Sequence, residues 1–350
     1  MCHSVQYDYA RVSADSFNFN PVFSRIKKYL NESDFLFGNL ETVTAGKKEG
    51  YSGYPFFNTP DDFITALKNA GFDLLSTANN HALDRGESGI RRTIGQLTKN
   101  HINYNGTFLS EKDRDSIRIF NIKGIKTAFL AYTYGTNGIP IPKGKDYLIN
   151  LIDTVKIRKE ISLARRDGAD IVLVHFHFGD EYQRYPNNYQ KVVVEKTINY
   201  GADIIIGGHT HVLQPIRYFK TRDAGLDSGF VIYSMGNFIS NQRWRYSDGG
   251  MVLSFTLIKN VSQDSVYLGD VEYLPIWVFK GATLNGREYI IVPSEASFSD
   301  SLYSFLTRED RKLAAQSFHD TQDILLKYSH NPHLRSIISD FISPFQFIVF

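Results

Sequence analysis

Short apolar runs alternate with longer amphipathic segments along the first 230 residues of the chain. Between the apolar runs, the spacing of apolar positions predicts helices at about 58–71, 87–99, 150–166 and 188–200. Strands that alternate with helices of this length are typical of βαβ units, so the pattern predicts an α/β fold with helices on both faces of a sheet. The predicted buried strands are residues 33–40, 72–78, 102–106, 126–132, 169–179 and 202–208.

The helix that follows residue 58 has recognisable boundary signals. Thr59 is expected to be its N-cap, Pro60 suits the first helical position, and Asp62 could complete a capping box. Gly71 is expected to end the helix, because glycine adopts the left-handed conformation of a helix C-terminus without strain.

The pattern changes after residue 229. Apolar segments at 229–238, 249–258 and 267–279 predict consecutive, antiparallel strands, and residues 307–328 predict an amphipathic helix with Thr307 as its N-cap. We therefore expect a mixed sheet system with a partly helical C-terminal extension. The predicted division is a principal domain over residues 1–280 and an extension over 281–350 that packs on the same domain.

The composition of the chain argues against several classes of protein. The 350 residues are 42% hydrophobic and 22% charged, which is ordinary for a globular chain with a full core. The net charge of +2 and the lack of long basic runs predict no nucleic-acid partner. The single cysteine, Cys2, excludes an intrachain disulfide and a cysteine-based zinc site. No stretch approaches the ~18 apolar residues that would suggest a membrane span.

Polar side chains gather where four predicted strands end. In open α/β sheets, ligands bind beyond the carboxyl ends of the strands, so these side chains are expected to meet at one edge. Of His175 and His177, we expect one to face the site, on the argument that side chains alternate along a strand. The whole set is Glu41, Asn80, His81, His175, His177, His209 and His211.

Imidazole nitrogens, a carboxylate and an amide oxygen suit Zn²⁺, Mn²⁺, Fe or Co. Two such ions about 3.5–4 Å apart can clamp an oxyanion and lower the pKa of a bridging water to about 7. A single histidine after a strand is more often a hydrogen-bonded structural residue, so the prediction rests on the joint pattern. His209 and His211 share a face if their strand continues, and either could then reach a metal.

Five segments, in order, resemble the motifs of the CapA family, which is named for poly-γ-glutamate capsule synthesis and belongs to the metallophosphatase-like superfamily. The resemblance covers about residues 1–240 and implies layered β-sheets flanked by helices. The segments are "GNLET" (38–42), "STANNHALDRG" (76–86), "HFGDEY" (177–182), "GADIIIGGHTHVLQPI" (201–216) and "YSMGNFI" (233–239).

The resemblance also implies roles for individual residues. Glu41 would be a bridging carboxylate, Asn80 an amide ligand, and His177, His209 and His211 imidazole ligands of one or two divalent ions (Mn, Zn or Fe). His81 would face the substrate and donate to a leaving group or oxyanion. Asp84 either orients His81 or caps the helix that begins near residue 87. Rim and wall contacts are assigned to Arg85, Glu181, Tyr182, Ser234 and Asn237.

The start of the sequence departs from the family pattern. Family members begin with a strand that ends in Gly-Asp, and that aspartate binds metal, whereas this chain starts at "MCHS". Two explanations are open: residues are missing upstream, or the site is degenerate. We expect the natural gene to encode further residues that end in Gly-Asp and one more residue before Met1. His3 could contribute to the site, although its spacing does not match Asp-x-His.

Three hypotheses about function follow. The first is a metal-dependent hydrolase of a phosphoester, or of an amide or polymer linkage. The second is a non-catalytic envelope protein that binds or exports an anionic polymer, and the third, suggested by the many aromatic residues, is a carbohydrate-binding module. The resemblance favours capsule production, with an anionic polymer or phosphoester as substrate and capsule-synthesis membrane proteins as partners. It implies a location in the cell envelope or outside the cytoplasm, with the cytoplasm as the alternative.

Overall fold

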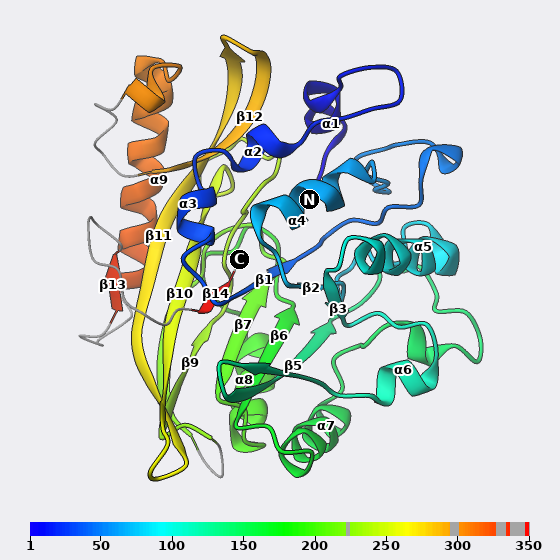
Figure 1. The fold of residues 1–350 in the computed structure, drawn as a ribbon, viewed down its shortest axis with the longest axis vertical. Coiled ribbons are helices and arrows are strands. Elements are labelled where there is room, and N and C mark those ends of the chain that lie inside the picture. Colours follow the sequence, from blue (N-terminus) through cyan, green and yellow to red (C-terminus); the bar gives the residue numbers. More distant parts are fainter. Residues whose placement is uncertain (222–224, 295–300, 327–333, 337–346, 350) are drawn as a thin grey trace.

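Two β-sheets lie face to face in this chain, and helices cover their outer sides (Figure 1). The computed structural model describes residues 1–221, 225–294, 301–326, 334–336 and 347–349. The predicted α/β class, with mixed sheets flanked by helices, is confirmed. Among the described residues, no helix is both long and apolar enough to cross a membrane.

The six-stranded sheet has the order β4-β5-β6-β7-β9-β8. Strands β5, β6, β7 and β9 run parallel, and β4 and β8 pair antiparallel at the two edges. Helices α7 (Thr154–Arg166) and α8 (Asn188–Asn199) pack on its outer face. The strands are β4 (Arg118–Ile122), β5 (Ile125–Thr133), β6 (Ile171–His177), β7 (Ile204–Gly208), β8 (Ile216–Lys220) and β9 (Ser228–Ile232).

The second sheet has the order β12-β11-β10-β14-β1-β2-β3, and β13 pairs with β11. Its β1, β2 and β3 are parallel, whereas β10, β11 and β12 are antiparallel. The strands are β1 (Phe35–Asn39), β2 (Leu74–Ser76), β3 (Asn103–Asn105), β10 (Gly249–Asn260), β11 (Ser265–Thr283), β12 (Gly286–Pro293), β13 (Leu334–Ser336) and β14 (Phe347–Val349).

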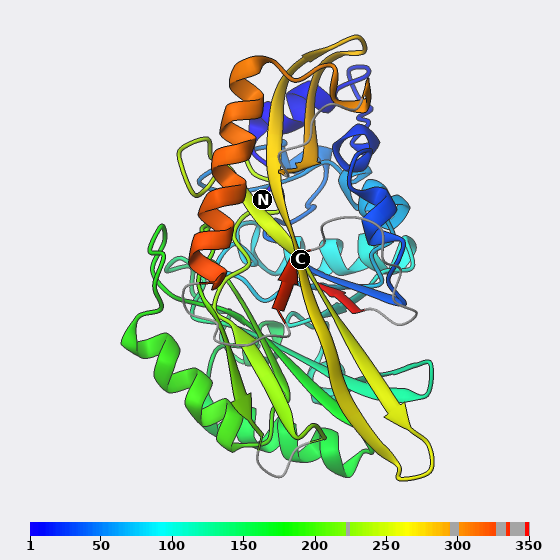
Figure 2. The same cartoon turned by 90° about the vertical axis from the view of Figure 1, so that its left-hand side faces the viewer.

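Helices pack on both sides of this second sheet. Helix α4 (Asp62–Ala70) covers β1 and β2 on the outside, and α9 (Arg308–Leu326) runs alongside β11 (Figure 2). The other helices are α1 (Ser4–Ala10), α2 (Asn20–Phe23), α3 (Lys27–Leu30), α5 (Gly86–Lys99) and α6 (Glu111–Asp115), with 3₁₀ turns η1 (Lys47–Glu49), η2 (Asp146–Leu148) and η3 (Ser301–Tyr303).

The main core lies between the two sheets. Phe37 of β1 and Phe255 of β10 face Leu173 of β6 and Ile206 of β7, and all four side chains are buried. Val172 of β6 points the opposite way, toward the helices of the outer layer. Strands of this kind are buried on both faces, which explains why they form continuous apolar runs in the sequence.

The predicted helix boundaries are partly right. Gly71 ends α4 in the left-handed conformation, with φ 110°, and Thr307 caps α9, since its hydroxyl accepts from the Asp310 N–H at 3.2 Å. The prediction for Thr59 is wrong, because α4 begins at Asp62 with Asp61 as N-cap. The Thr59 hydroxyl instead pairs with that of Thr42 at 2.7 Å, and this contact holds residue 59 against the segment after β1.

The prediction for residues 229–238 is also wrong in its pairing. The first residues of this segment belong to β9, which pairs with β7 in parallel and belongs to the six-stranded sheet, whereas β10 and β11 form the expected antiparallel pair. An apolar run does not reveal its partner strand. Strand β11 continues through residue 280 to Thr283, so the sheet is continuous at the predicted domain boundary, and that division remains a prediction.

Candidate metal centre

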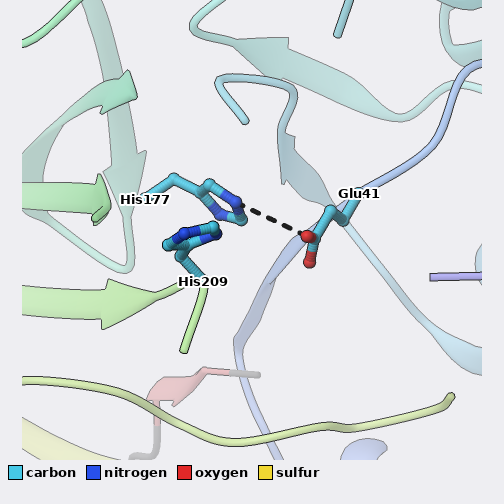
Figure 3. Close-up of side chains that lie close together, drawn as sticks. All are labelled: Glu41, His177 and His209. Atoms are coloured by element: carbon cyan, nitrogen blue, oxygen red, sulfur yellow. Dashed lines mark ion pairs between the residues drawn. The ribbon is translucent and has the colours of Figure 1, made fainter. Parts of the chain in front are cut away.

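The carboxyl ends of β1 and β2 in one sheet meet those of β6 and β7 in the other. The structure brings together the five side chains to which ligand roles were assigned, and all five are buried. The His177 and His209 ring centroids are 4.8 Å apart. Figure 3 shows these two imidazoles beside the Glu41 carboxylate. The five are Glu41, Asn80, His177, His209 and His211.

The turn after β7 explains the two glycines that precede its histidines. A Cβ at Gly207 would lie 2.0 Å from the Tyr233 carbonyl oxygen, so only glycine lets β7 approach the segment after β9 this closely. A Cβ at Gly208 would have ordinary contacts at 3.7 Å or more. The strand ends there, and His209 and His211 have positive φ values of 90° and 60°. Such conformations are costly outside glycine and persist only where surrounding contacts enforce them.

The expectation that only one of His175 and His177 faces the site is wrong in its reasoning. Residues two apart in a strand share a face, and a Cβ at Gly208 would lie 3.7 Å from His175 Nε2 and 3.8 Å from His177 Nδ1. Both imidazoles therefore point between the sheets. His177, at the end of β6, reaches the ligand group, whereas His175 lies earlier in the strand, with its ring 5.6 Å from that of Phe37.

Glu41 lies between two imidazoles. Its Oε1 is 3.5 Å from His177 Nε2 and 3.8 Å from His211 Nε2, and this buried oxygen has no hydrogen-bond partner. Two ligands bound at about 2.1 Å to one tetrahedral ion lie about 3.4 Å apart. The spacing is thus long for a hydrogen bond and close to that of two ligands of a common cation.

Asn80 contacts His177 and is itself held by a loop residue. Its Oδ1 is 2.8 Å from His177 Nε2, and its Nδ2 donates to Asn137 Oδ1 at 3.0 Å. Because Asn137 fixes which end of the Asn80 amide carries the donor, the Asn80 oxygen is directed at the ligand group. Asn137 has a φ of 52° in the loop after β5, and no sequence motif marked it.

The protonation states suit a cation. Burial would raise the pKa of the Glu41 carboxyl, but the imidazoles of His177 and His211 outweigh burial and hold that pKa well below its usual range. Burial lowers the pKa of His209 to about 2 and also lowers that of His211. An ionised Glu41 carboxylate and a neutral His209 imidazole are the forms that bind metal.

Asp84 orients His81 and does not cap α5. The Asp84 Oδ2 lies 2.8 Å from His81 Nδ1 and also accepts the Phe57 N–H at 2.6 Å. The N-cap of α5 is Arg85, which makes no side-chain capping bond. The Phe57 ring meets the His81 ring edge-on, with centroids 4.6 Å apart. With Nδ1 held by Asp84, Nε2 is the ring nitrogen of His81 that this contact leaves open.

Three of the predicted rim and wall residues contact other protein groups. Arg85 Nη2 donates to Ser52 Oγ at 2.6 Å, and the Ser234 hydroxyl accepts the Gly236 N–H at 3.3 Å. Asn237 lies behind a predicted ligand, with its Oδ1 3.2 Å from His211 Nδ1. The structure therefore gives Asn237 an orienting contact, and the substrate roles of these three residues remain predictions.

Glu181 and Tyr182 lie in the turn after β6, close to His211. The Glu181 Oε1 is 3.9 Å from His211 Nε2, and the Tyr182 and His211 ring centroids are 5.9 Å apart. Tyr182 also meets Trp244 edge-on at 5.2 Å, and both rings are partly exposed. Trp244 was not predicted, because it lies in a loop outside every motif.

Sequence reasoning missed one further residue near the centre, Tyr134, and left the role of another, His3, open. Tyr134, in the loop after β5, places its ring 4.6 Å from that of His209, and nothing in its local sequence indicates this. His3 lies at the N-terminus of α1, with its ring 5.3 Å from that of Phe57 and its Nε2 3.4 Å from Ser240 Oγ. Burial lowers the pKa of His3 to about 4.

A cavity of about 80 Å³ adjoins the ligand group. Glu41, His209 and His211 form part of its wall, and Phe63, Phe72 and other apolar side chains form much of the rest. One side of the centre therefore adjoins a cavity with a largely apolar wall.

Sequence comparison places this chain in a known family. Residues 1–242 match the family described as bacterial capsule synthesis protein PGA_cap. The chain belongs to this family. It is 31% identical over 247 residues to the capsule biosynthesis protein CapA of Bacillus anthracis, covering 68% of this chain and 58% of that protein. It is 30% identical over 243 residues to the PGA biosynthesis protein CapA of Bacillus subtilis, covering 68% of this chain and 62% of that protein.

This member of the capsule synthesis family thus spans about three fifths of the length of the curated relatives it matches. Among solved structures, it is similar to the Haemophilus influenzae NAD nucleotidase, with a TM-score of 0.42 and 12% identity. That similarity covers 81% of this chain and 50% of the nucleotidase.

The residues present fit a divalent cation. Two groups, Glu41 with His177 and His209, and Glu181 with His209 and His211, each place their ligand atoms within 4.8 Å of one another. Buried polar atoms without hydrogen-bond partners, Glu41 Oε1 among them, lower the stability of the fold unless something binds them. Mixed nitrogen and oxygen ligands suit Zn²⁺, Mn²⁺ or Fe.

Proposed function

We propose that this chain is a metal-dependent hydrolase of anionic substrates, with phosphoesters as the favoured class. The observation that supports this most is the buried Glu41 carboxylate, whose unpartnered Oε1 lies 3.5 and 3.8 Å from two imidazole nitrogens. Asn80 and His209 would complete the ligands of the ion. Such an ion, when bound, stabilises developing negative charge and makes water a nucleophile at neutral pH.

His81 is the proposed general acid. Asp84 holds Nδ1 of the ring, fixes its orientation and stabilises the imidazolium form. The Nε2 proton would pass to the leaving-group oxygen as its bond to phosphorus breaks, so that an alcohol leaves and no free alkoxide forms. General acids of this kind contribute about 10²- to 10⁴-fold to a rate.

Membership of the capsule synthesis family supports a biological setting for this chemistry. We propose that the chain works in capsule production in the cell envelope, on an anionic polymer or a phosphoester linked to its synthesis. Its proposed partners are other capsule-synthesis proteins of the membrane.

The test is turnover by the metal-loaded protein. A panel of phosphomonoesters, phosphodiesters and γ-glutamyl peptides would be assayed with Mn²⁺, Zn²⁺ or Fe²⁺, with His209→Ala as the control that lacks a ligand. Turnover of a phosphoester that His209→Ala abolishes supports the proposal. Saturable binding of poly-γ-glutamate without turnover of any panel member would reject it and favour a non-catalytic polymer-binding protein.

A further inference from the structure

We propose that Glu181 is a ligand of a second divalent cation, held together with His211 and Glu41. The family resemblance gave Glu181 only a contact at the rim, and the assignment rests on the proposed metal centre. The first cation would be held by Asn80, His177 and His209, with Glu41 between the two ions.

The positions of the ligand atoms lead to this division. His211 Nε2 has two carboxylate oxygens within 4 Å, Glu41 Oε1 at 3.8 Å and Glu181 Oε1 at 3.9 Å. His209 is near both groups, but a neutral imidazole offers a single lone pair, so it can serve one ion. With His209 on the first ion, Glu181 and His211 are left from their group for a second ion, and Glu41, 3.8 Å from His211 Nε2, would lie between the two.

Hydrogen bonds fix the tautomer of His211. Asn237 Nδ2 donates to Gln242 Oε1 and to the Ser247 carbonyl oxygen, both at 2.8 Å. Its Oδ1 is therefore the acceptor that faces His211 Nδ1 at 3.2 Å, and Nδ1 carries the proton. The lone pair of His211 is consequently on Nε2, the nitrogen that faces the carboxylates.

This arrangement turns the Nε2 lone pair of His211 toward two carboxylate oxygens. In this tautomer Nε2 has no proton to offer either carboxylate. Lone pairs that face one another at this distance repel unless a cation lies among them. The same contacts are favourable once a divalent ion binds all three atoms.

Glu181 is held in place through its backbone and its neighbour. The Phe178 N–H donates to the Gly208 carbonyl oxygen at 3.3 Å, and the Tyr182 N–H donates to that of Thr210 at 2.7 Å. These bonds join the turn after β6 to the turn that carries His209 and His211. Tyr182 has a φ of 65°, a conformation that a tyrosine keeps only under such constraint.

A ring of side chains completes the support. Gln242 Nε2 donates to the Tyr182 hydroxyl at 3.0 Å, and Gln242 is bonded to Asn237, which orients His211. Glu181 and His211 are thus positioned by one connected network. The Glu181 side chain is 43% exposed, whereas that of Glu41 is 7% exposed, so the second ion would be the one nearer to solvent.

The test is metal stoichiometry, measured without substrate. Purified wild-type protein, Glu181→Gln and the neighbouring Asp180→Asn would be titrated with Mn²⁺, followed by electron paramagnetic resonance and elemental analysis. We expect two ions per chain and a spin-coupled spectrum for the wild type and for Asp180→Asn. Glu181→Gln should bind one ion tightly, give a mononuclear spectrum, and bind the second at least tenfold more weakly.

Two results would overturn the assignment: a Glu181→Gln variant that binds two ions as tightly as wild type does, or a wild type that binds only one. Failure of the hydrolase proposal is distinguishable from both. A two-ion wild type without turnover rejects the hydrolase and leaves Glu181 as a ligand. A Glu181→Gln variant with two tight ions and full turnover rejects the ligand and leaves the hydrolase.

Discussion

We propose that some residues of this centre bind a cation and that another, His81, moves a proton. Glu41, His177 and His209 place their ligand atoms within 4.8 Å of one another, whereas His81 is occupied at Nδ1 by Asp84. Substitutions should therefore affect metal content and turnover separately.

Replacing His81 tests that division. We expect His81→Ala to keep the metal content of wild type and to lower turnover by about 10²- to 10⁴-fold, because the ring moves a proton and holds no ion. His209→Ala should lose metal. Elemental analysis and turnover, measured on the same preparations, check both statements. Equal metal loss in the two variants would show that His81 is a ligand.

Buried histidines should make the metal-free protein sensitive to acid. Burial lowers the pKa of His175 to about 3 and that of His209 to about 2, so both stay neutral in the folded state at pH 5.5. The same groups take up protons in the unfolded chain below about pH 6.5. The unfolded state then binds more protons, and stability falls as the pH falls.

Urea unfolding of metal-free protein at pH 7.5 and 5.5 measures this effect. Each histidine should contribute a loss of about 1 kcal/mol between these pH values. His175→Asn should show a smaller loss than wild type, since it removes one of the buried histidines whose pKa is lowered. A pH-independent free energy of unfolding would contradict the assignment of neutral, buried imidazoles.

At the scale of elements, the turn after β7 depends on close backbone contact between neighbouring segments. Gly207→Ala should lower the free energy of unfolding by about 1–3 kcal/mol, because its Cβ would meet the Tyr233 carbonyl oxygen at 2.0 Å. Gly208→Ala is the matched control, with contacts no shorter than 3.7 Å. Urea unfolding of both variants without metal compares them, and equal losses would show that this strand contact is not the constraint.

Much of the element order could be predicted from periodicity, whereas strand pairing could not. Helices α5, α7 and α8 lie where apolar spacing predicted them, since one apolar stripe reports one buried face. Strand β9 was placed in the wrong sheet, because its local sequence carries no information about β7.

The same limit applies at the site. Motifs at strand ends marked Glu41 and His177, but Asn137 and Tyr134 come from a loop without a periodic pattern. Their contacts with Asn80 and His209 exist only because the chain returns to the same edge. Loop residues of this kind are visible only in three dimensions.

For the whole molecule, the centre joins two sheets whose facing core is largely apolar. A bound cation stabilises the folded state by about 2.7 kcal/mol at 100 times its Kd. We therefore expect chelation to lower the thermal midpoint of wild type, and to lower that of His209→Ala by less, as measured by circular dichroism. An equal midpoint for wild type with and without chelator would show that the centre binds no ion in the folded protein.

The sequence separation of Glu41 from His177 has a consequence for the order of folding. These side chains lie 3.5 Å apart, although 135 residues lie between them along the chain. Contacts between distant segments close slowly, because the loop entropy is lost before the contact forms. High-affinity metal uptake during refolding would therefore mark the late step at which the two sheets dock, and a partly folded chain would release its ion.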